Sequence, residues 1–217
     1  MTPIYHITHL TNLDSIIKRG GLACDADAER QNLCQQSIAY DDLKARRRRK
    51  RVKKTDDSAV AAGGVLPDYV PFYFCNRSPM LGAIHKREMR GYQGGQRDVI
   101  YLVSHAETVA KSELVWCFTD GHAVEAMTEF YDRLEDLNRV DWEAVRTWRW
   151  GGRWLLGNPD VKRRKQAEFL VHGMFPWKLV DQIGALGEDI AAEVRRLLRD
   201  AIHKPKVTIE PDWYYNI

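Results

Sequence analysis

The feature that most constrains this chain is a carboxylate at the head of a short apolar run, in the stretch KQAEFLV at residues 165–171. Glu168 directly precedes three apolar residues, 169–171, which predict a short buried strand. A carboxylate beside a buried strand loses hydration, and a positive group must face it to offset that cost. Taken alone, the stretch is best explained as an edge carboxylate paired with one of the four basic residues at 162–165.

Composition favours one globular unit. The chain has 217 residues, 44% of them hydrophobic, and predicts a single domain spanning residues 1–217. The four cysteines form no CxxC pair and have no histidines at zinc spacing, so we expect no metal and the reduced thiols of a cytoplasmic protein. There is no secretory signal and no apolar run near the roughly 18 residues of a membrane span, so no membrane association is expected.

Alternating polarity at residues 3–8 predicts a first strand, with His6 and Thr8 on one face. A helix follows, capped by Thr11 or Asn12 and ended by the glycines at 20–21. Polar side chains on a strand beside a helix start form a plausible nucleotide-binding corner. A histidine and a threonine satisfied by neighbouring backbone explain this segment equally well.

Basic residues are concentrated in one run, where nine of the eleven residues 44–54 are Lys or Arg. Such a run repels itself, which predicts a mobile segment over residues 41–66 unless it meets phosphates. The density of charge favours a polyanionic partner over a merely solvated face. Charge alone does not distinguish nucleic acid from a dinucleotide.

An aromatic strand is predicted at residues 68–74, followed by a helix that Ser78 caps and Pro79 begins. The positive end of that helix could bind an anion. Further along, strands are expected at 98–104, 113–118 and 207–210, and helices at 106–112, 123–137, 176–183 and 188–202, with a loop at 23–40. Strands and helices without a regular βαβ rhythm predict an α+β fold.

The usual fingerprints of metal, nucleophile and phosphate-loop chemistry are absent from the sequence. A histidine strand, an arginine cluster, an aromatic strand and one glutamate instead fit a substrate that is cleaved to a cation. Breaking a glycosidic bond with oxocarbenium character needs a carboxylate near the sugar, and NAD offers such a bond. The runner-up is a nucleic-acid-binding module without chemistry, whose arginines and tryptophans bind phosphates and bases.

Five stretches together resemble the DarT family, the DNA ADP-ribosyltransferase toxins of bacterial toxin–antitoxin modules: YHIT at 5–8, GGL at 20–22, DYVPFYF at 68–74, RSPML at 77–81 and KQAEFLV at 165–171. The resemblance runs over nearly the whole chain. It implies an ADP-ribosyltransferase fold, with a split central β-sheet core and peripheral helices around an NAD cleft. It also implies transfer of ADP-ribose from NAD to thymine or guanine in single-stranded DNA, and a cognate DarG-type macrodomain antitoxin. An RNA or protein acceptor is a third possibility.

The resemblance assigns roles by position. Glu168 matches the catalytic glutamate, and an arginine at the start of the basic run matches the second catalytic residue; Arg46 is the first choice and Arg47 the alternative. The residues expected to bind NAD are His6, Ile7, Thr8, Asn12, Leu22, Tyr73, Met80 and Arg46. The residues expected to contact DNA are Arg48, Arg49, Arg51, Lys162, Arg163, Arg164, Trp150 and Trp154.

Overall fold

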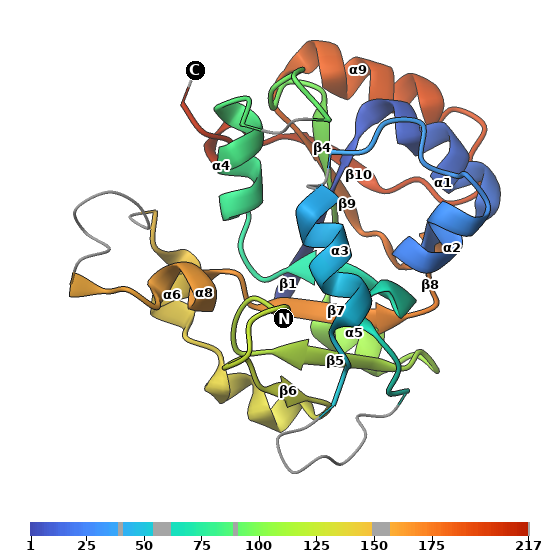
Figure 1. The fold of residues 1–217 in the computed structure, drawn as a ribbon. Coiled ribbons are helices and arrows are strands. Elements are labelled where there is room, and N and C mark those ends of the chain that lie inside the picture. Colours follow the sequence, from blue (N-terminus) through green and yellow to red (C-terminus); the bar gives the residue numbers. More distant parts are fainter. Residues whose placement is uncertain (39–40, 54–61, 89–90, 149–156, 217) are drawn as a thin grey trace.

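A computed structural model describes residues 1–38, 41–53, 62–88, 91–148 and 157–216 (Figure 1). Its centre is a mixed sheet of eight strands in the order β10-β9-β4-β1-β3-β7-β5-β6. In chain order these are β1 Pro3–His9, β3 Tyr69–Tyr73, β4 Val99–His105, β5 Trp116–Thr119, β6 Phe130–Tyr131, β7 Glu168–His172, β9 Gln182–Ala185 and β10 Lys206–Ile209. A separate pair joins β2 Gly21–Ala23 to β8 Met174–Pro176.

The sheet is split at its middle. Strand β1 pairs with β4 over its full length, from Pro3 opposite His105 to His9 opposite Val99. On its other side β1 pairs with β3 at a single position, Tyr5 opposite Tyr73. The two halves of the sheet therefore diverge beyond that pair, as the split core of the predicted fold requires, and side chains of β1 after Tyr5 face an opening.

Helices pack around both halves of the sheet. In Figure 1, α1, α2 and α9 lie beside one half, α6 and α8 lie together at the opposite side, and α3 crosses the middle. Within the described residues the α-helices are α1 Leu13–Arg19, α2 Asp25–Arg30, α3 Asp41–Arg49, α4 Pro79–His85, α5 Ala106–Ala110, α6 Trp142–Arg146, α8 Val161–Lys165 and α9 Glu188–Leu197. Short 3-10 helices occur at Leu10–Asn12, Leu66–Asp68, Leu134–Arg139, Trp177–Leu179 and Pro211–Trp213.

Two helix ends follow from the local sequence as predicted. Ser78 accepts a hydrogen bond from the backbone N–H of Leu81, and Pro79 occupies the first helical position of α4. Helix α1 ends at Gly20, whose φ of 82° lies in the left-handed region that glycine adopts without strain. The chain can therefore turn directly from α1 into β2.

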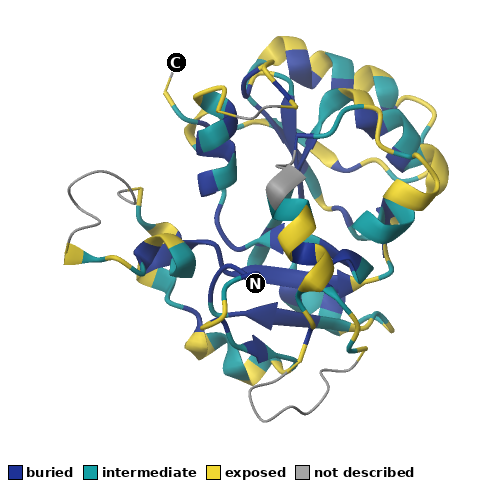
Figure 2. Ribbon diagram, in the orientation of Figure 1, coloured by how far each residue is buried: buried dark blue, intermediate teal, exposed yellow. Residues whose placement is uncertain are grey.

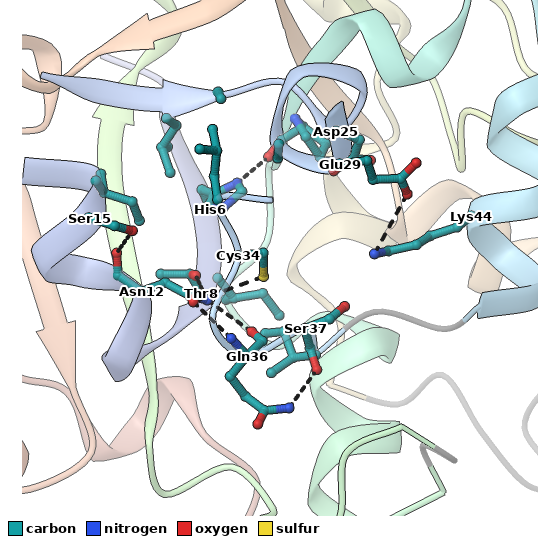
Figure 3. A pocket seen from close by; sticks show the side chains of 18 of the residues that line it. His6, Thr8, Asn12, Ser15, Asp25, Glu29, Cys34, Gln36, Ser37 and Lys44 are labelled. Atoms are coloured by element: carbon teal, nitrogen blue, oxygen red, sulfur yellow. Dashed lines mark hydrogen bonds and ion pairs between the residues drawn. The ribbon is translucent and has the colours of Figure 1, made fainter. Parts of the chain in front are cut away.

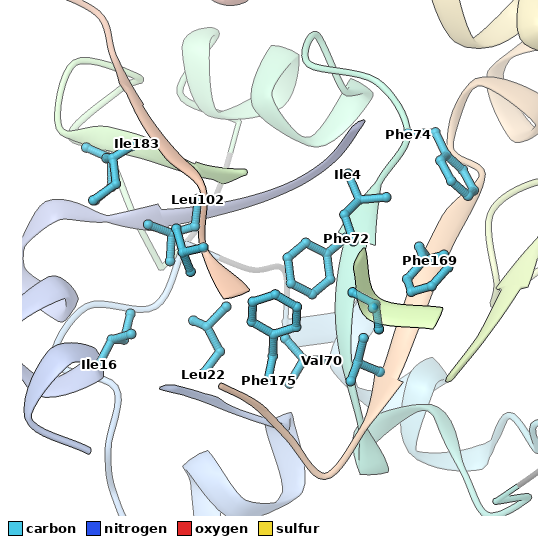
Figure 4. Packing of buried hydrophobic residues seen from close by; sticks show 14 of the residues in the cluster. Ile4, Ile16, Leu22, Val70, Phe72, Phe74, Leu102, Phe169, Phe175 and Ile183 are labelled. Carbon is cyan, nitrogen blue, oxygen red and sulfur yellow. The ribbon is translucent and has the colours of Figure 1, made fainter. Parts of the chain in front are cut away.

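The core is built on the inward faces of the central strands (Figures 2 and 4). Phe72 of β3 and Phe175 of β8 pack with ring centroids 4.7 Å apart, and both are buried. Phe169 of β7 packs edge-on against Phe74 at 6.2 Å. Burying side chains of this size contributes roughly 1.5–3 kcal/mol each, so this packing stabilises the strands that flank the opening.

The predicted helix over residues 123–137 is wrong. That segment contains a turn, the short strand β6 and the 3-10 helix Leu134–Arg139. Tertiary hydrogen bonds use its backbone instead, since the N–H of Ala123 donates to Glu168 and β6 pairs with β5. These contacts outweigh the apolar periodicity on which the helix was predicted.

Three other expectations are also corrected. Residues 176–183 are not a helix, because β9 pairs with β4 and β10. Residues 23–40 are not all loop, since they include α2. The first part of the 41–66 segment is ordered as helix α3, because acidic side chains of other elements pair with its cations. Residues 54–61 of that segment lie outside the described residues.

Candidate active site

A cavity of about 460 Å³ opens where the two halves of the sheet diverge (Figure 3). Strands β1, β3 and β7 and helices α1, α2 and α3 all contribute to its wall. Among the residues expected to bind NAD, all except Arg46 line it: His6, Ile7, Thr8, Asn12, Leu22, Tyr73 and Met80. Glu168 and Arg47 line the same cavity.

His6 spans the opening between the two strands. Its Nδ1 lies 2.8 Å from the carbonyl oxygen of Pro71 on β3. Because a carbonyl only accepts, Nδ1 carries the proton and Nε2 is left as an acceptor. Burial lowers the pKa of His6, despite the opposing effect of the Pro71 carbonyl and Asp25. The ring is therefore neutral at pH 7.

Asn12 organises the loop that closes one side of the cavity. Its side-chain oxygen accepts hydrogen bonds from the backbone N–H groups of Gln35 and Gln36, at 2.9 and 3.0 Å. Its side-chain nitrogen donates to Thr8 Oγ1 at 3.1 Å and to the Gln36 carbonyl at 2.9 Å. Asn12 is buried. It therefore shapes the cavity wall by holding residues 35–36 against β1.

Glu168 begins β7 and is 2% exposed. Its Oε2 accepts from Arg47 Nη1 at 2.9 Å, and its Oε1 accepts from the backbone N–H of Ala123 at 2.9 Å. The N–H of Glu168 donates to Thr119 Oγ1 at 3.0 Å. One cation and one backbone donor thus offset the burial of the carboxylate, and its orientation is fixed from three sides.

The structure places Arg47, and not Arg46, against this carboxylate. Arg47 is 7% exposed, whereas the side chain of Arg46 is 55% exposed and pairs with Glu125 at 3.0 Å. Burial alone would lower the pKa of Arg47, but Glu168 and Asp25 outweigh it and raise the pKa above its ordinary value. The Nε and Nη2 groups of Arg47 are buried without a hydrogen-bond partner, although Asp25 lies 3.8 Å from Nε. They are donors available to a ligand in the cavity.

Helix α3 is held over the cavity by acidic residues of α2. Arg48 pairs with Glu29 at 2.9 Å, and Lys44 lies 3.9 Å from the same carboxylate. Both Glu29 and Asp25 line the cavity. Since α3 carries Arg47, these contacts position the buried guanidinium as well as the helix.

Tyr73 and Met80 form an apolar wall beside the carboxylate. Tyr73 lies opposite Glu168 in the β3–β7 ladder, and its hydroxyl donates to Met80 Sδ at 3.7 Å. Burial, and next the charge of Glu168, raises the pKa of Tyr73 far above its ordinary value. The phenol therefore stays neutral and presents a flat apolar face to the cavity.

Comparison with known proteins identifies the family. A family profile described as "ssDNA thymidine ADP-ribosyltransferase, DarT" matches residues 5–215. The chain is 42% identical to a DNA ADP-ribosyl transferase of Thermus sp. (strain 2.9), over 99% of this chain and 96% of that protein. It is 32% identical to one of Mycobacterium tuberculosis, over 98% of this chain and 88% of that protein. The chain belongs to the DarT family.

Solved structures of the DarT family agree. Thermus sp. 2.9 DarT in complex with ADP-ribosylated ssDNA superimposes with a TM-score of 0.89 at 41% identity, covering 99% of this chain and 96% of that one. The same protein in complex with NAD+ gives 0.85 at 40% identity, covering 99% and 98%. These similarities confirm the α+β ADP-ribosyltransferase fold, the DNA ADP-ribosyltransferase activity and NAD as co-substrate. The runner-up, a binding module without chemistry, is thereby set aside.

The residues expected to contact DNA in this DarT-family chain fall into two groups. Arg163 pairs with Asp160 at 2.8 Å and with Asp120 at 3.2 Å, and Arg164 pairs with Asp141 and Asp160, so both are engaged within the fold. Arg48 is engaged with Glu29. The remaining described residues, Arg49, Arg51 and Lys162, are exposed. Trp150 and Trp154 lie outside the described residues.

Sequence reasoning missed His122 and Asp25. His122 is 7% exposed, its Nε2 is buried without a hydrogen-bond partner, and that atom lies 4.0 Å from Glu168 Oε1. Burial lowers its pKa, against the opposing charge of Glu168, which leaves it neutral at pH 7. No motif around His122 distinguishes it from any other turn histidine. The turn at 119–123, which no local pattern predicts, carries it to the carboxylate.

Within the described ranges, no group of three or more His, Cys, Asp or Glu side chains is arranged to hold a metal ion. No helix among those residues is both long and apolar enough to cross a membrane.

Proposed function

We propose that the chain transfers ADP-ribose from NAD to thymine in single-stranded DNA, with Glu168 and Arg47 as its catalytic pair. The observation that carries this is the buried ion pair, which lies in the wall of the cavity formed by the diverging strands. The family profile names thymidine, and the Thermus relative's structure is described with ADP-ribosylated ssDNA. The profile favours thymine over guanine as the acceptor, and the Thermus structure supports single-stranded DNA as the substrate.

NAD supplies the ADP-ribosyl group, which a glycosidic bond joins to a positively charged nicotinamide. When that bond breaks, its electron pair stays with nicotinamide, which leaves as a neutral molecule, and positive charge develops on the sugar. Glu168 presents a fixed negative charge to the sugar, where positive charge develops as that bond breaks. Since Arg47 and Ala123 already hold both carboxylate oxygens, the group needs little reorganisation during the reaction. Tyr73 and Met80 form an apolar wall that would exclude water from the same place.

Arg47 acts by its charge and its unpaired donors. An arginine with a raised pKa does not accept a proton near pH 7, so we assign it no role as base. Its positive charge lowers the cost of removing a proton from a nucleobase beside it. Its Nε and Nη2 groups can also hold a phosphate or carbonyl oxygen of the bound substrates.

His122 is the proposed acceptor of the nucleobase proton. Its imidazole is neutral, and its Nε2 lies 4.0 Å from Glu168 Oε1. A neutral imidazole has a free electron pair that can take a proton, which an arginine lacks. Burial lowers the pKa of His122, so the negative charge of Glu168, which acts in the opposite direction, would be needed to hold that proton. Glu125, whose carboxylate lies 3.8 Å from His122 Nδ1, would stabilise the imidazolium that results.

A partner that reverses the modification is also proposed. The chain is 25% identical over 212 residues to a "DNA ADP-ribosyl transferase-DNA ADP-ribosyl glycohydrolase fusion protein" of Thermosipho africanus, covering 48% of that protein. There a transferase is joined to an enzyme of opposite activity. A separate antitoxin of the DarG macrodomain type would remove the ADP-ribose that the present chain adds, as expected for a toxin.

The test is acceptor competition with labelled NAD. The protein is incubated with single-stranded oligonucleotides that contain thymine or guanine as the only reactive base, with the matching RNA, and with a protein pool. We expect label on thymine-containing DNA and on none of the others. Label on guanine DNA would change the assigned base, and label only on RNA or protein would overturn the proposal.

A further inference from the structure

A second, smaller cavity lies at the end of the sheet where β3 ends and β7 begins. Its volume is about 330 Å³, and its wall includes Arg77 after β3, Arg146 at the end of α6 and Lys165 at the end of α8. These three segments are far apart in sequence, and three cations converge on one space. Asp212 is the acidic residue of the lining.

The two arginines of this cavity are not neutralised by the fold. Among the described residues neither Arg77 nor Arg146 has a carboxylate within ion-pair distance, unlike Arg163 and Arg164 nearby. The Nε of Arg77 is buried and has no hydrogen-bond partner. A buried donor without an acceptor is unfavourable, so we expect it to find a partner in a ligand.

Lys165 builds the floor of the cavity. It is 1% exposed, and its Nζ donates to the carbonyls of Val145 at 3.0 Å and Thr147 at 2.6 Å. Those two residues flank Arg146, so the lysine fixes the backbone from which Arg146 projects. Trp148, which also lines the cavity, is 67% exposed.

The cavity adjoins the active site along two paired strands. Lys165 precedes Glu168 by three residues, and Arg77 follows Tyr73, the partner of Glu168, by four. The ladder continues between them through the hydrogen bond from Phe74 N to the Ala167 carbonyl at 3.3 Å. At about 3.3 Å per extended residue, the rim lies on the order of 10 Å from the carboxylate.

We infer that this cavity binds a backbone phosphate of the DNA strand being modified, with Trp148 stacking on an adjacent base. Paired cations beside an exposed aromatic ring are the usual means of holding a single strand. The inference rests on the proposed function and deepens it, because it assigns the path of the strand away from the target base. In this arrangement Arg77 and Arg146 contact the DNA backbone, as the basic residues of α3 were expected to do.

The test measures binding of a fluorescent thymine-containing oligonucleotide as a function of salt. Each phosphate contact on a single strand contributes about 0.7 to the slope of log K against log salt. Because the two arginines share one phosphate, the double variant Arg77→Gln/Arg146→Gln is expected to lose about 0.7 from that slope, and about fivefold in affinity at roughly 0.1 M salt. Arg199→Gln, a charge-matched control after α9, should change neither.

Two further variants guard against misfolding. Asp212→Asn removes the opposing charge and should tighten DNA binding by about twofold, a gain that unfolding does not produce. Trp148→Ala should weaken binding at least about fivefold without changing the slope. NAD affinity should stay constant in all of them, which separates a DNA phosphate from the phosphates of NAD.

An unchanged slope in the double variant would overturn the inference, as would equal losses for NAD and DNA. These binding results do not depend on transfer. If the double variant loses the expected part of the slope but the wild-type protein transfers no ADP-ribose to DNA, the proposed function is overturned and the phosphate cavity remains.

Discussion

Replacing Arg47 and Arg46 separately by glutamine should distinguish the two neighbours sharply. Arg47→Gln leaves Glu168, which is 2% exposed, with the Ala123 N–H as its remaining donor in the described structure. Removing one partner of a buried ion pair typically costs about 3–5 kcal/mol. The low end applies here, because the substitution also removes two buried N–H groups that have no partner. We therefore expect a loss of about 3 kcal/mol in the free energy of unfolding.

Arg46→Gln breaks a pair whose side chains are 55% and 39% exposed. Such pairs contribute about 0.2–1 kcal/mol. For a chain of this length, 1 kcal/mol corresponds to roughly 2–4 °C in Tm, so Arg47→Gln should lower Tm by about 6–12 °C and Arg46→Gln by less than about 4 °C.

The assay is urea unfolding of the ligand-free protein at pH 7, followed by tryptophan fluorescence. Glu168→Gln and the combined Arg47→Gln/Glu168→Gln complete a double-mutant cycle, in which the combined loss should fall short of the sum by about 1–3 kcal/mol. Equal losses for Arg46→Gln and Arg47→Gln, or strict additivity in the cycle, would refute the assignment of Arg47 as the partner of Glu168.

Two other predictions concern the cavity wall and pH. Asn12→Ala frees the backbone N–H groups of residues 35–36 and should raise the KM for NAD about tenfold with kcat nearly unchanged, whereas Thr11→Ala should leave both constant. Burial lowers the pKa of His6 and of His122. Below the ordinary histidine pKa of about 6.5, the unfolded chain therefore binds more protons than the folded chain. The free energy of unfolding should stay constant above that pH and fall below it. In urea titrations at several pH values, the double variant His6→Gln/His122→Gln should show a smaller fall. An unchanged pH dependence in this variant would contradict the prediction.

Much of the fold could be predicted because its strands carry their own pattern. The alternation at residues 3–8 and the apolar run after Glu168 are confirmed as β1 and β7, and the Ser78-Pro79 pair begins α4 as expected. The helix over 123–137 was wrong because its backbone is engaged by Glu168 and other distant groups. Local periodicity carries no information about such bonds.

The residues of the site, like those of the fold, could be predicted only in part. Residues on β1 and β3 that share a face with the opening could be placed from strand alternation together with family resemblance. The choice between Arg46 and Arg47 could not, because four consecutive arginines carry no register signal until α3 is docked against α2. His122 depends on a turn, and the Arg77–Arg146 cavity depends on three segments that meet only in the folded chain.

The catalytic role of Glu168 is tested by comparing Glu168→Gln with Glu125→Gln in single-turnover transfer from NAD to a thymine-containing oligonucleotide. Glutamine keeps the shape of the side chain and removes its charge. We predict a loss of about three orders of magnitude for Glu168→Gln, a loss below about tenfold for Glu125→Gln, and DNA binding nearly intact in both. Transfer by Glu168→Gln at the wild-type rate would contradict the central claim that this buried carboxylate drives the reaction.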